Sequence, residues 1–408
     1  ALLLGALSPL EAELARATSE RLAVLATTRV DFFAGATLRA LEINATIPAM
    51  QGYSDIAAEC FLEVVGRFAG LPEQAIARLR NAARSNARAL HGALLAGYRR
   101  MRPGREPLRI ALLCRRADAQ LTELVYLRDR FRALGTDAEV VYPDQLGGDD
   151  DAVLVDGRRY DLIYRHLFVR RLEEPSMVGA DAVRRLLAEE NGRRAVVLNP
   201  PASQVEVKSV FALLSLALTN EGLAQSAGLT DDELAAIEAT VPWTRVLRAP
   251  DLVAEIAAHP DRYVLKRAWD YGGRAVFVGT ARDEAAFRAR VEAAWPDSKA
   301  VPLDWPALCA RAAVDPRGGG FVVQALVTTQ TEPHVLCQQD GPKPADLYVD
   351  FSAYASVGIE EDVRWGGVCR GSTSSIVNIM GGGGVVPLIT ADAARELEAC
   401  LAAAGRPT

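Results

Sequence analysis

Cysteine and histidine are scarce in this sequence of 408 residues, which contains six cysteines and four histidines. No two cysteines form a C-x-x-C pair, which argues against a structural zinc site and against a dense disulfide framework. Widely spaced cysteines of this kind are usually reduced thiols, and reduced thiols are typical of the cytoplasm. We therefore expect a cytoplasmic protein.

Long apolar runs and an excess of positive charge are also missing. No stretch approaches the roughly 20 apolar residues that a membrane-spanning helix needs, and the short apolar start, residues 1–7, lacks a basic flank. The formal net charge is −6, which disfavours nucleic acids and anionic membranes as partners. Small polyanions such as nucleotides stay compatible with this charge, because a local cluster of basic side chains suffices to bind them.

The pattern of apolar residues predicts a chain of mixed helices and strands. Ser8, Pro9 and Glu11 occupy the N-cap, N1 and N3 positions of a predicted helix. Two strands joined by a turn at Gly35 follow it. Residues 56–101 have helical periodicity and predict two or three helices. The sequence leaves open whether these helices form a homodimer surface or a lid.

Residues 106–200 alternate apolar strands with helices, which is the pattern of a small parallel sheet. The remaining chain predicts a helix at 204–219, a strand, glycine loop and strand at 263–279, a strand at 318–327, long strands at 345–356 and 365–380, and a helix at 390–405.

The predicted hairpin near the start of the chain carries several oxygen ligands. A turn at Gly35, or one residue later, places Asp31 opposite Glu42. Arg29 and Asn44 share the face of these carboxylates, because strand side chains alternate with period two. Two close carboxylates repel each other unless a proton or a cation neutralises them, and oxygen ligands suit Mg²⁺ beside nucleotide phosphates. A solvated strand face with an arginine–aspartate pair is the alternative.

Lys266 ends a predicted apolar strand, where a buried lysine without an anion is costly. Six residues later, Gly272 and Gly273 allow backbone N–H groups to approach a phosphate closely. No G-K-[ST] follows these glycines, so they are not a Walker loop, and a plain hairpin turn is the alternative. Lys208 lies on a predicted helix, either as a ligand or on a solvated face. Gln324 interrupts an apolar strand, either as a satisfied core group or beside an adenine.

Together these segments resemble glutathionylspermidine synthetase-like enzymes, which are circularly permuted ATP-grasp ligases. The family has Arg-x-Asp-Phe, a spacer, and Glu-x-Asn-Ala before a Thr/Ser-Pro-type loop. This chain has Arg29, Asp31, Phe32, Glu42, Asn44, Ala45, Thr46 and Pro48 at these places. Later family segments resemble residues 199–201 with Lys208, residues 263–266 with Gly272 and Gly273, and residues 321–324, in the family's order.

The chain also departs from the family. Ala325 stands where an acidic residue usually follows the hinge glutamine, and no amidase domain is present. The C-terminal part is more similar to permuted ATP-grasp proteins of unassigned substrate, so the substrate does not carry over. Asp350 and Asn378 form a rival metal set, which ranks second because Ile376 stands where a paired glutamate would be expected.

The resemblance implies an α/β (α+β) fold, a circularly permuted ATP-grasp with a small parallel-sheet pre-ATP-grasp domain and a helical N-terminal segment. Residues 1–105 would contain the metal-hairpin strands of the ATP-grasp core plus helices. Residues 106–200 would form the pre-ATP-grasp α/β domain, and residues 201–408 the nucleotide-binding domain. A plain Rossmann-like binding protein, suggested by residues 106–200 alone, would leave the ligands of the hairpin unexplained.

The implied activity is ATP-dependent ligation of a small-molecule or peptide carboxylate to an amine, through an acyl phosphate, with release of ADP and phosphate. ATP and Mg²⁺ are the implied cofactors. A phosphotransferase on the same scaffold and a non-catalytic ATP-grasp-like binding protein are the alternatives. The expected roles are metal binding by Asp31, Glu42 and Asn44, phosphate neutralisation by Lys208 and Lys266, loop closure by Gly272 and Gly273, and adenine contact by Gln324. Arg29 is expected to steady the acceptor carboxylate or the acyl phosphate. Arg370 is expected to bind the acid substrate, with an ordinary surface arginine as the alternative.

Overall fold

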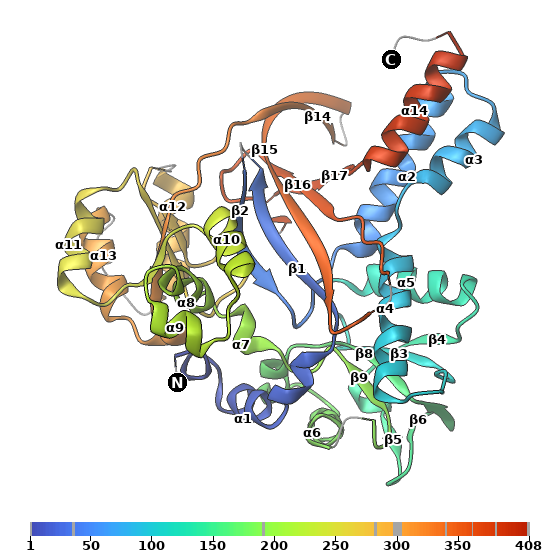
Figure 1. The fold of residues 1–408 in the computed structure, drawn as a ribbon, viewed down its shortest axis with the longest axis horizontal. Coiled ribbons are helices and arrows are strands. Elements are labelled where there is room, and N and C mark those ends of the chain that lie inside the picture. Colours follow the sequence, from blue (N-terminus) through green and yellow to red (C-terminus); the bar gives the residue numbers. More distant parts are fainter. Residues whose placement is uncertain are drawn as a thin grey trace.

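The computed structural model describes residues 2–34, 37–189, 192–280, 284–296, 304–338, 341–360, 362–379 and 382–405. The turn predicted at Gly35 lies outside these residues. Two antiparallel sheets, a parallel sheet and a small three-stranded sheet are joined and covered by helices (Figure 1).

The largest sheet joins the two ends of the chain. Its strand order is β17-β16-β15-β1-β2, and β14 pairs with one end of β15. Asp31 faces Glu42, and Arg29 faces Asn44, so the predicted register of the hairpin is confirmed. The strands are β1 (Leu25–Ala34), β2 (Leu38–Asn44), β14 (Glu332–Gln338), β15 (Gly341–Val357), β16 (Val368–Ser372) and β17 (Gly384–Val386).

The second antiparallel sheet carries the lysine strand and has the order β10-β13-β11-β12. A stack of Phe277, Trp295 and Phe321, with ring centroids 5.5–5.6 Å from the tryptophan, packs its core. The strands are β10 (Thr244–Val246), β11 (Tyr263–Arg267), β12 (Val276–Val278) and β13 (Phe321–Ala325). Around them lie α7 (Ser203–Glu206), α8 (Ser209–Ala217), α9 (Glu221–Ser226), α10 (Asp231–Thr240), α11 (Pro250–Ala258), α12 (Glu284–Ala294) and α13 (Trp305–Val314).

A parallel sheet with the order β4-β3-β8-β9 confirms the expectation for residues 106–200. Every residue of β3 and β8 is buried, as strands covered on both faces require. The elements are β3 (Ile110–Cys114), α5 (Leu121–Ala133), β4 (Ala138–Val141), β8 (Leu162–His166), α6 (Ala180–Ala188) and β9 (Val196–Leu198). The small sheet of β5 (Gly147–Gly148), β6 (Val153–Val155) and β7 (Arg158–Tyr160) was not predicted.

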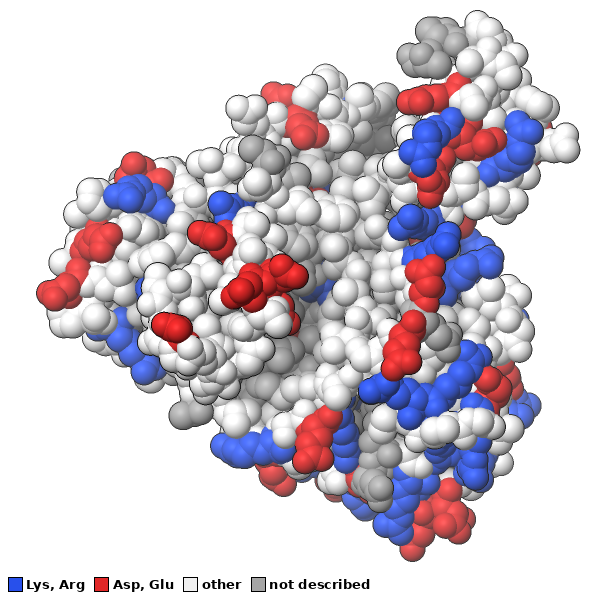
Figure 2. Space-filling model, in the orientation of Figure 1, with Lys and Arg blue, Asp and Glu red and all other residues white. Residues whose placement is uncertain are grey.

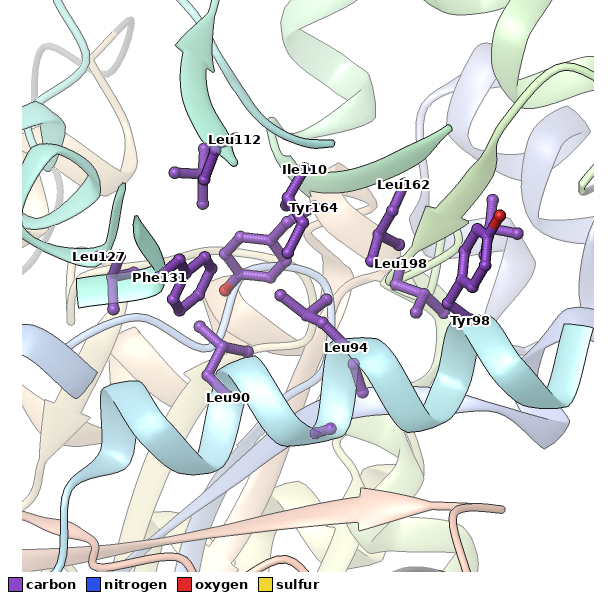
Figure 3. Close-up of a cluster of buried hydrophobic side chains, with 14 of the residues drawn as sticks. Leu90, Leu94, Tyr98, Ile110, Leu112, Leu127, Phe131, Leu162, Tyr164 and Leu198 are labelled. Atoms are coloured by element: carbon purple, nitrogen blue, oxygen red, sulfur yellow. The ribbon is translucent and has the colours of Figure 1, made fainter. Parts of the chain in front are cut away.

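Helices near the start of the chain pack against this parallel sheet. The capping box of Ser8 and Glu11 is present at the start of α1 (Pro9–Ala17), as predicted. The region predicted as two or three helices contains three, α2 (Gln51–Phe68), α3 (Glu73–Ala82) and α4 (Asn86–Met101). Leu90, Leu94 and Tyr98 of α4 point toward the strands (Figure 3). The last helix, α14 (Ala391–Ala403), packs on α3.

The strand predicted over residues 365–380 is much shorter than expected, because β16 ends at Ser372. Two serine hydroxyls then compete for backbone N–H groups. Ser372 Oγ accepts from the N–H of Ser374 at 3.1 Å, and Ser374 Oγ accepts from the N–H of Ile376 at 3.3 Å. The resulting bends bring Asn378 to the glycine loop, where its Nδ2 donates to Gly272 O at 2.6 Å.

Among the described residues, no helix has both the length and the apolar character needed to cross a membrane. On the face shown in Figure 2, basic and acidic side chains intermingle along the edge formed by α2, α3, α4 and α14. This face therefore presents no broad surface of one sign.

Candidate functional site

A cavity of about 560 Å³ lies between the two antiparallel sheets. Residues of β1, β2, β15 and β16 line one side of it, and residues of β11, β12 and β13 line the other. The rival metal residues Asp350 and Asn378 line it as well. All the predicted site residues line this cavity: Arg29, Asp31, Glu42, Asn44, Lys208, Lys266, Gly272, Gly273, Gln324 and Arg370.

Lys266 is buried in the cavity wall, and its ammonium group contacts only neutral oxygens in the described part of the chain. Its Nζ donates to Leu41 O at 3.1 Å and to Gln324 Oε1 at 2.7 Å. Burial, together with the nearby charge of Lys208, lowers the pKa of Lys266 to about 8. The charge of Glu42 acts on Lys266 in the opposite direction but without direct contact, and a buried cation whose contacts are all neutral oxygens is suited to bind an anion.

Gln324 supports Lys266 instead of facing open space. Its Oε1 accepts from the lysine, and its Nε2 donates to Thr244 Oγ1 at 3.1 Å. Both ends of the amide are therefore engaged, although the residue lines the cavity. An adenine beside this strand would meet the backbone and side chains that follow Gln324, residues 325–329, which also line the cavity.

Lys208 stands between α7 and α8, as the N-cap of α8, and not within a continuous helix. Its Nζ donates to Asp270 O at 2.8 Å and lies 3.8 Å from Glu42 Oε2. The Glu42 side chain is 34% exposed, so this pair is long and partly solvated. Such a pair contributes little to stability and leaves both groups able to bind a ligand.

Two arginines hold two buried aspartates on the sheet that joins the chain ends. Arg29 donates to Asp31 through Nε at 2.7 Å and Nη2 at 3.1 Å. Arg370 Nη2 donates to Asp31 Oδ2 at 2.8 Å, and Arg370 also forms a fork with Asp350. Burial alone would raise the pKa of Asp31, but the charges of the two arginines outweigh burial and lower it. Asp31 is therefore held ionised between two guanidinium groups, whereas burial raises the pKa of Asp350 despite its contact with Arg370.

Glu42 and Asn44 are the cavity oxygen donors best placed for a cation. Within the described ranges, no group of three or more His, Cys, Asp and Glu side chains could hold a metal ion. Asp31 and Asp350 line the cavity, but arginines already occupy their oxygens. The buried Asn44 Nδ2 has no hydrogen-bond partner in those ranges. A half-turn of the Asn44 amide would put its oxygen at this unpartnered position, where it would act as an acceptor. One carboxylate and one amide fit Mg²⁺ that is also bound to phosphates.

The glycine loop between β11 and β12 has the backbone shape that its sequence predicts. Gly272 and Gly273 have φ values of 67° and 69°, in the left-handed region that favours glycine. A Cβ atom on Gly273 would also come within 3.0 Å of Ile376. Arg274, the next residue, is exposed and makes no hydrogen bond or ion pair within the described part of the chain. The loop therefore presents a cation to the cavity.

Three buried polar residues anchor the site although the sequence assigned them no role, and only Asn199 lay in a segment, residues 199–201, that resembles the family. Asn199 Nδ2 donates to Thr27 O and Ala45 O, at 2.5 and 2.6 Å, so it ties both hairpin strands to β9. Arg165 is fully buried and donates to Pro200 O at 2.9 Å. Glu206 accepts from the backbone after β2. In the sequence, each of these residues appears only as a polar residue beside apolar ones. That pattern suggests a buried polar group but does not identify its partner.

The parallel sheet also reaches the cavity. The chain runs from β3 to β4 on one side of the sheet, whereas β8 lies on the other side of β3, so the order reverses between β3 and β8. Ligands of open α/β sheets bind beyond the carboxyl ends of strands at such a reversal. Gln120, in the segment after β3, and Phe168, after β8, line the cavity.

The electrostatic balance of the cavity differs from that of the chain. Six basic residues and four acidic residues line its described part, against a formal net charge of −6 for the whole protein. The cations least neutralised by carboxylates are Lys208, Lys266 and Arg274. The cavity is thus suited to a small polyanion.

The lowered pKa of Lys266 predicts a specific pH dependence of stability. Between pH 8 and the ordinary lysine value of 10.5, the unfolded chain binds a proton at this position that the folded chain does not. The free energy of unfolding should therefore rise with pH across this window, by roughly 3 kcal/mol at most. We expect urea unfolding at pH 8, 9 and 10 to show this rise in the wild type relative to Lys266→Met. A difference that stays constant with pH would contradict the assignment.

Comparison with known proteins identifies no family from sequence, because no family model and no curated protein matches the chain. Among solved structures, a glutathione synthetase-like effector from Globodera pallida in its apo form matches 93% of this chain and 80% of its own, with a TM-score of 0.58 and 10% identity. This likeness is close enough to compare folds and too distant in sequence to transfer an activity.

Two further solved structures have lower scores. A putative gamma-glutamylcysteine synthetase from Methylobacillus flagellatus matches 96% of this chain and 91% of its own, with a TM-score of 0.46 and 12% identity. A RimK domain ATP-grasp protein from Sphaerobacter thermophilus matches 72% of this chain and 97% of its own, with a TM-score of 0.27 and 15% identity. Both TM-scores are below 0.5, so neither structure supports an assignment of the fold. The likeness to the glutathione synthetase-like effector shows that this chain shares the mixed α/β fold of that protein.

Proposed function

We propose that this chain is an ATP-dependent ligase that joins a carboxylate to an amine. One observation carries the proposal. Residues chosen from five segments, far apart in sequence, line a single cavity whose least neutralised side chains are cations. The leading alternatives on the same fold are an ATP-dependent phosphotransferase and a non-catalytic binding protein.

We propose further that the fold is circularly permuted, as in glutathionylspermidine synthetase-like enzymes. The hairpin that carries Glu42 and Asn44 comes first in the chain, yet β1 pairs along much of its length with β15 near the other end. Strands adjacent in a sheet but distant in sequence are what a permutation would produce from an ordinary hairpin order. This pairing supports the permutation.

The nucleotide would lie between the two sheets. Lys266 and Lys208 would neutralise phosphate oxygens, and the glycine loop with Arg274 would cover them. The adenine would meet the apolar side chains of Val264 and Val278 and the backbone of residues 325–329, all of which line the cavity. In this arrangement Gln324 orients Lys266, and its contact with adenine is indirect.

Magnesium would be held by Glu42 and Asn44, together with the phosphates. When bound, the metal would neutralise charge on the β- and γ-phosphates. Asp31 would join these ligands only if Arg370 left its Oδ2. The arginine would then be available for an acid substrate, which gives both residues the roles expected of them.

The acid substrate would approach Arg29 and Arg370 from the parallel sheet. Gln120 and Phe168 line that end of the cavity and are the residues most suited to contact a second substrate. A substrate carboxylate oxygen would attack the γ-phosphorus as the bond to ADP breaks. The amine nitrogen would then attack the acyl carbon, lose a proton and expel phosphate, which leaves an amide. The protein contributes positioning and charge neutralisation to both steps.

The test is an ADP-release assay of the wild-type protein with Mg·ATP and pools of acids and amines, with mass analysis of the products. A ligase requires both an acid and an amine for turnover and yields a product joined by loss of water. Turnover without an amine, with a stable phosphorylated product, would establish the phosphotransferase. Nucleotide binding without ADP release from any pool would favour the binding protein.

A further inference from the structure

Glu206 is a buried carboxylate at the end of α7, only 5% exposed. Its Oε1 accepts from the backbone N–H of Ala45 at 2.5 Å and from the N–H of Thr46. Its Oε2 accepts from the hydroxyl of Tyr271 at 3.1 Å. One side chain therefore connects three segments that are distant in sequence.

Each partner of Glu206 adjoins a proposed ligand. Ala45 follows Asn44, the last residue of β2, and Tyr271 precedes Gly272 of the glycine loop. Lys208 lies two residues beyond Glu206 and is tied to the same loop. Its N–H donates to Ala268 O and its Nζ to Asp270 O, both at 2.8 Å. The metal strand, the phosphate loop and a phosphate lysine thus meet around Glu206.

We infer that Glu206 is a positioning residue for nucleotide binding, which sets the glycine loop at a fixed place relative to the strand that carries Glu42 and Asn44. This inference rests on the proposed function. Hydrogen bonds to a charged acceptor are about twice as strong as neutral ones, and a buried N–H left without its acceptor is costly. Without the hydrogen bond from Tyr271, the Glu206 carboxylate is held by one oxygen alone, so its hydrogen bonds to the N–H groups of Ala45 and Thr46 should weaken.

The surroundings of Glu206 reinforce this role. Arg165 donates to Pro200 O at 2.9 Å and reaches Thr46 O at 3.5 Å, so the peptide after β2 is held from both sides. The ring of Tyr271 packs against Phe168 and Trp269, with centroids 4.7 and 4.8 Å away. The hydroxyl is therefore aimed by packing on its ring.

The first experiment needs no nucleotide. Amide hydrogen exchange of Ala45 and Thr46 is compared in the wild type, Tyr271→Phe and Tyr98→Phe. Tyr98, a residue of α4 that does not line the cavity, is the matched control. Its hydroxyl also donates to a buried carboxylate, Asp161 Oδ2, at 2.9 Å. We expect Tyr271→Phe to speed exchange of both amides about tenfold, with no change in Tyr98→Phe. Unchanged exchange in Tyr271→Phe would overturn the coupling.

The second experiment measures binding of Mg·ATP and of adenosine to the same proteins. Tyr271→Phe should weaken ATP binding about tenfold and leave adenosine binding unchanged, because only the phosphates meet the coupled segments. Glu206→Gln, which keeps an acceptor for both amides, should restore most of the affinity that Glu206→Ala loses. Equal losses for ATP and adenosine would reduce Glu206 to a structural role. A wild type that binds no ATP would overturn the proposed function, while hydrogen exchange would still decide the coupling.

Discussion

Replacing Lys266 with Met is expected to lower the rate of ATP turnover by about 10²–10³-fold, the effect of removing one preorganised charge donor from an active site. The ammonium group is buried against Leu41 O and Gln324 Oε1, so phosphate oxygens would be its first anionic partners in the described structure. Methionine preserves the approximate volume of the side chain and removes its charge and its hydrogen-bond donors. ADP release and equilibrium binding of ATP measure the two consequences.

The matched control for this substitution is Lys343→Met. Lys343 is exposed on β15, and it does not line the cavity. In Lys266→Met, two buried oxygens lose their donor, which costs about 1–3 kcal/mol of stability, so a folded protein must be verified by its unfolding transition. Full turnover by a folded Lys266→Met protein would remove the lysine from the proposed site, and an equal loss in Lys343→Met would point to a general effect of charge.

Replacing Glu42 with Gln should reduce turnover of Mg·ATP by a similar factor of about 10²–10³, with little change in stability. Its carboxylate is partly solvated, and among the described residues its ion-pair partner is Lys208, at 3.8 Å. Surface substitutions of this kind usually change the free energy of unfolding by about 0.5 kcal/mol or less. A loss of turnover would therefore reflect the ligand set and not the fold.

A crossed binding experiment separates a metal ligand from a merely nearby acid. Without magnesium, Glu42→Gln should bind ATP more tightly than the wild type, because a negative charge close to the phosphates is gone. With magnesium, it should bind ATP less tightly, because the metal has lost a ligand. The control Glu398→Gln, an exposed residue of α14, should do neither. Equal shifts with and without magnesium would contradict metal binding by Glu42.

Local features of this fold could be predicted from sequence because they depend on neighbouring residues. Asp31 pairs directly with Glu42 as expected, but a bulge between Asp31 and Phe32 shifts the register by one residue, and alternation about one turn does not predict that shift. The capping box at Ser8 and the buried strands of the parallel sheet follow from similar short patterns. The residues that gather in the cavity were chosen by family resemblance, and their roles remain predictions.

The remaining features depend on contacts that no local pattern encodes. Glu206 stands between two valines, and nothing nearby in sequence announces that the backbone after β2 is its partner, 161 residues away. The engagement of Asp31 by Arg370 crosses 339 residues, so the sequence suggested only the pair of Arg29 with Asp31 and did not predict that Arg370 joins it. The early end of β16 arises from serine hydroxyls that compete locally, a balance that β-propensity alone does not describe.

The pairing of β1 with β15 has a consequence for synthesis on the ribosome. Thr28 and Ala355 contact each other across 327 residues, so at about 5–20 residues per second the first hairpin waits for tens of seconds before its neighbour emerges. During that interval one edge of β1 is open to solvent or to another nascent chain. Association with chaperones while the chain is being made, and strand exchange between copies at high expression, are the behaviours that this delay favours.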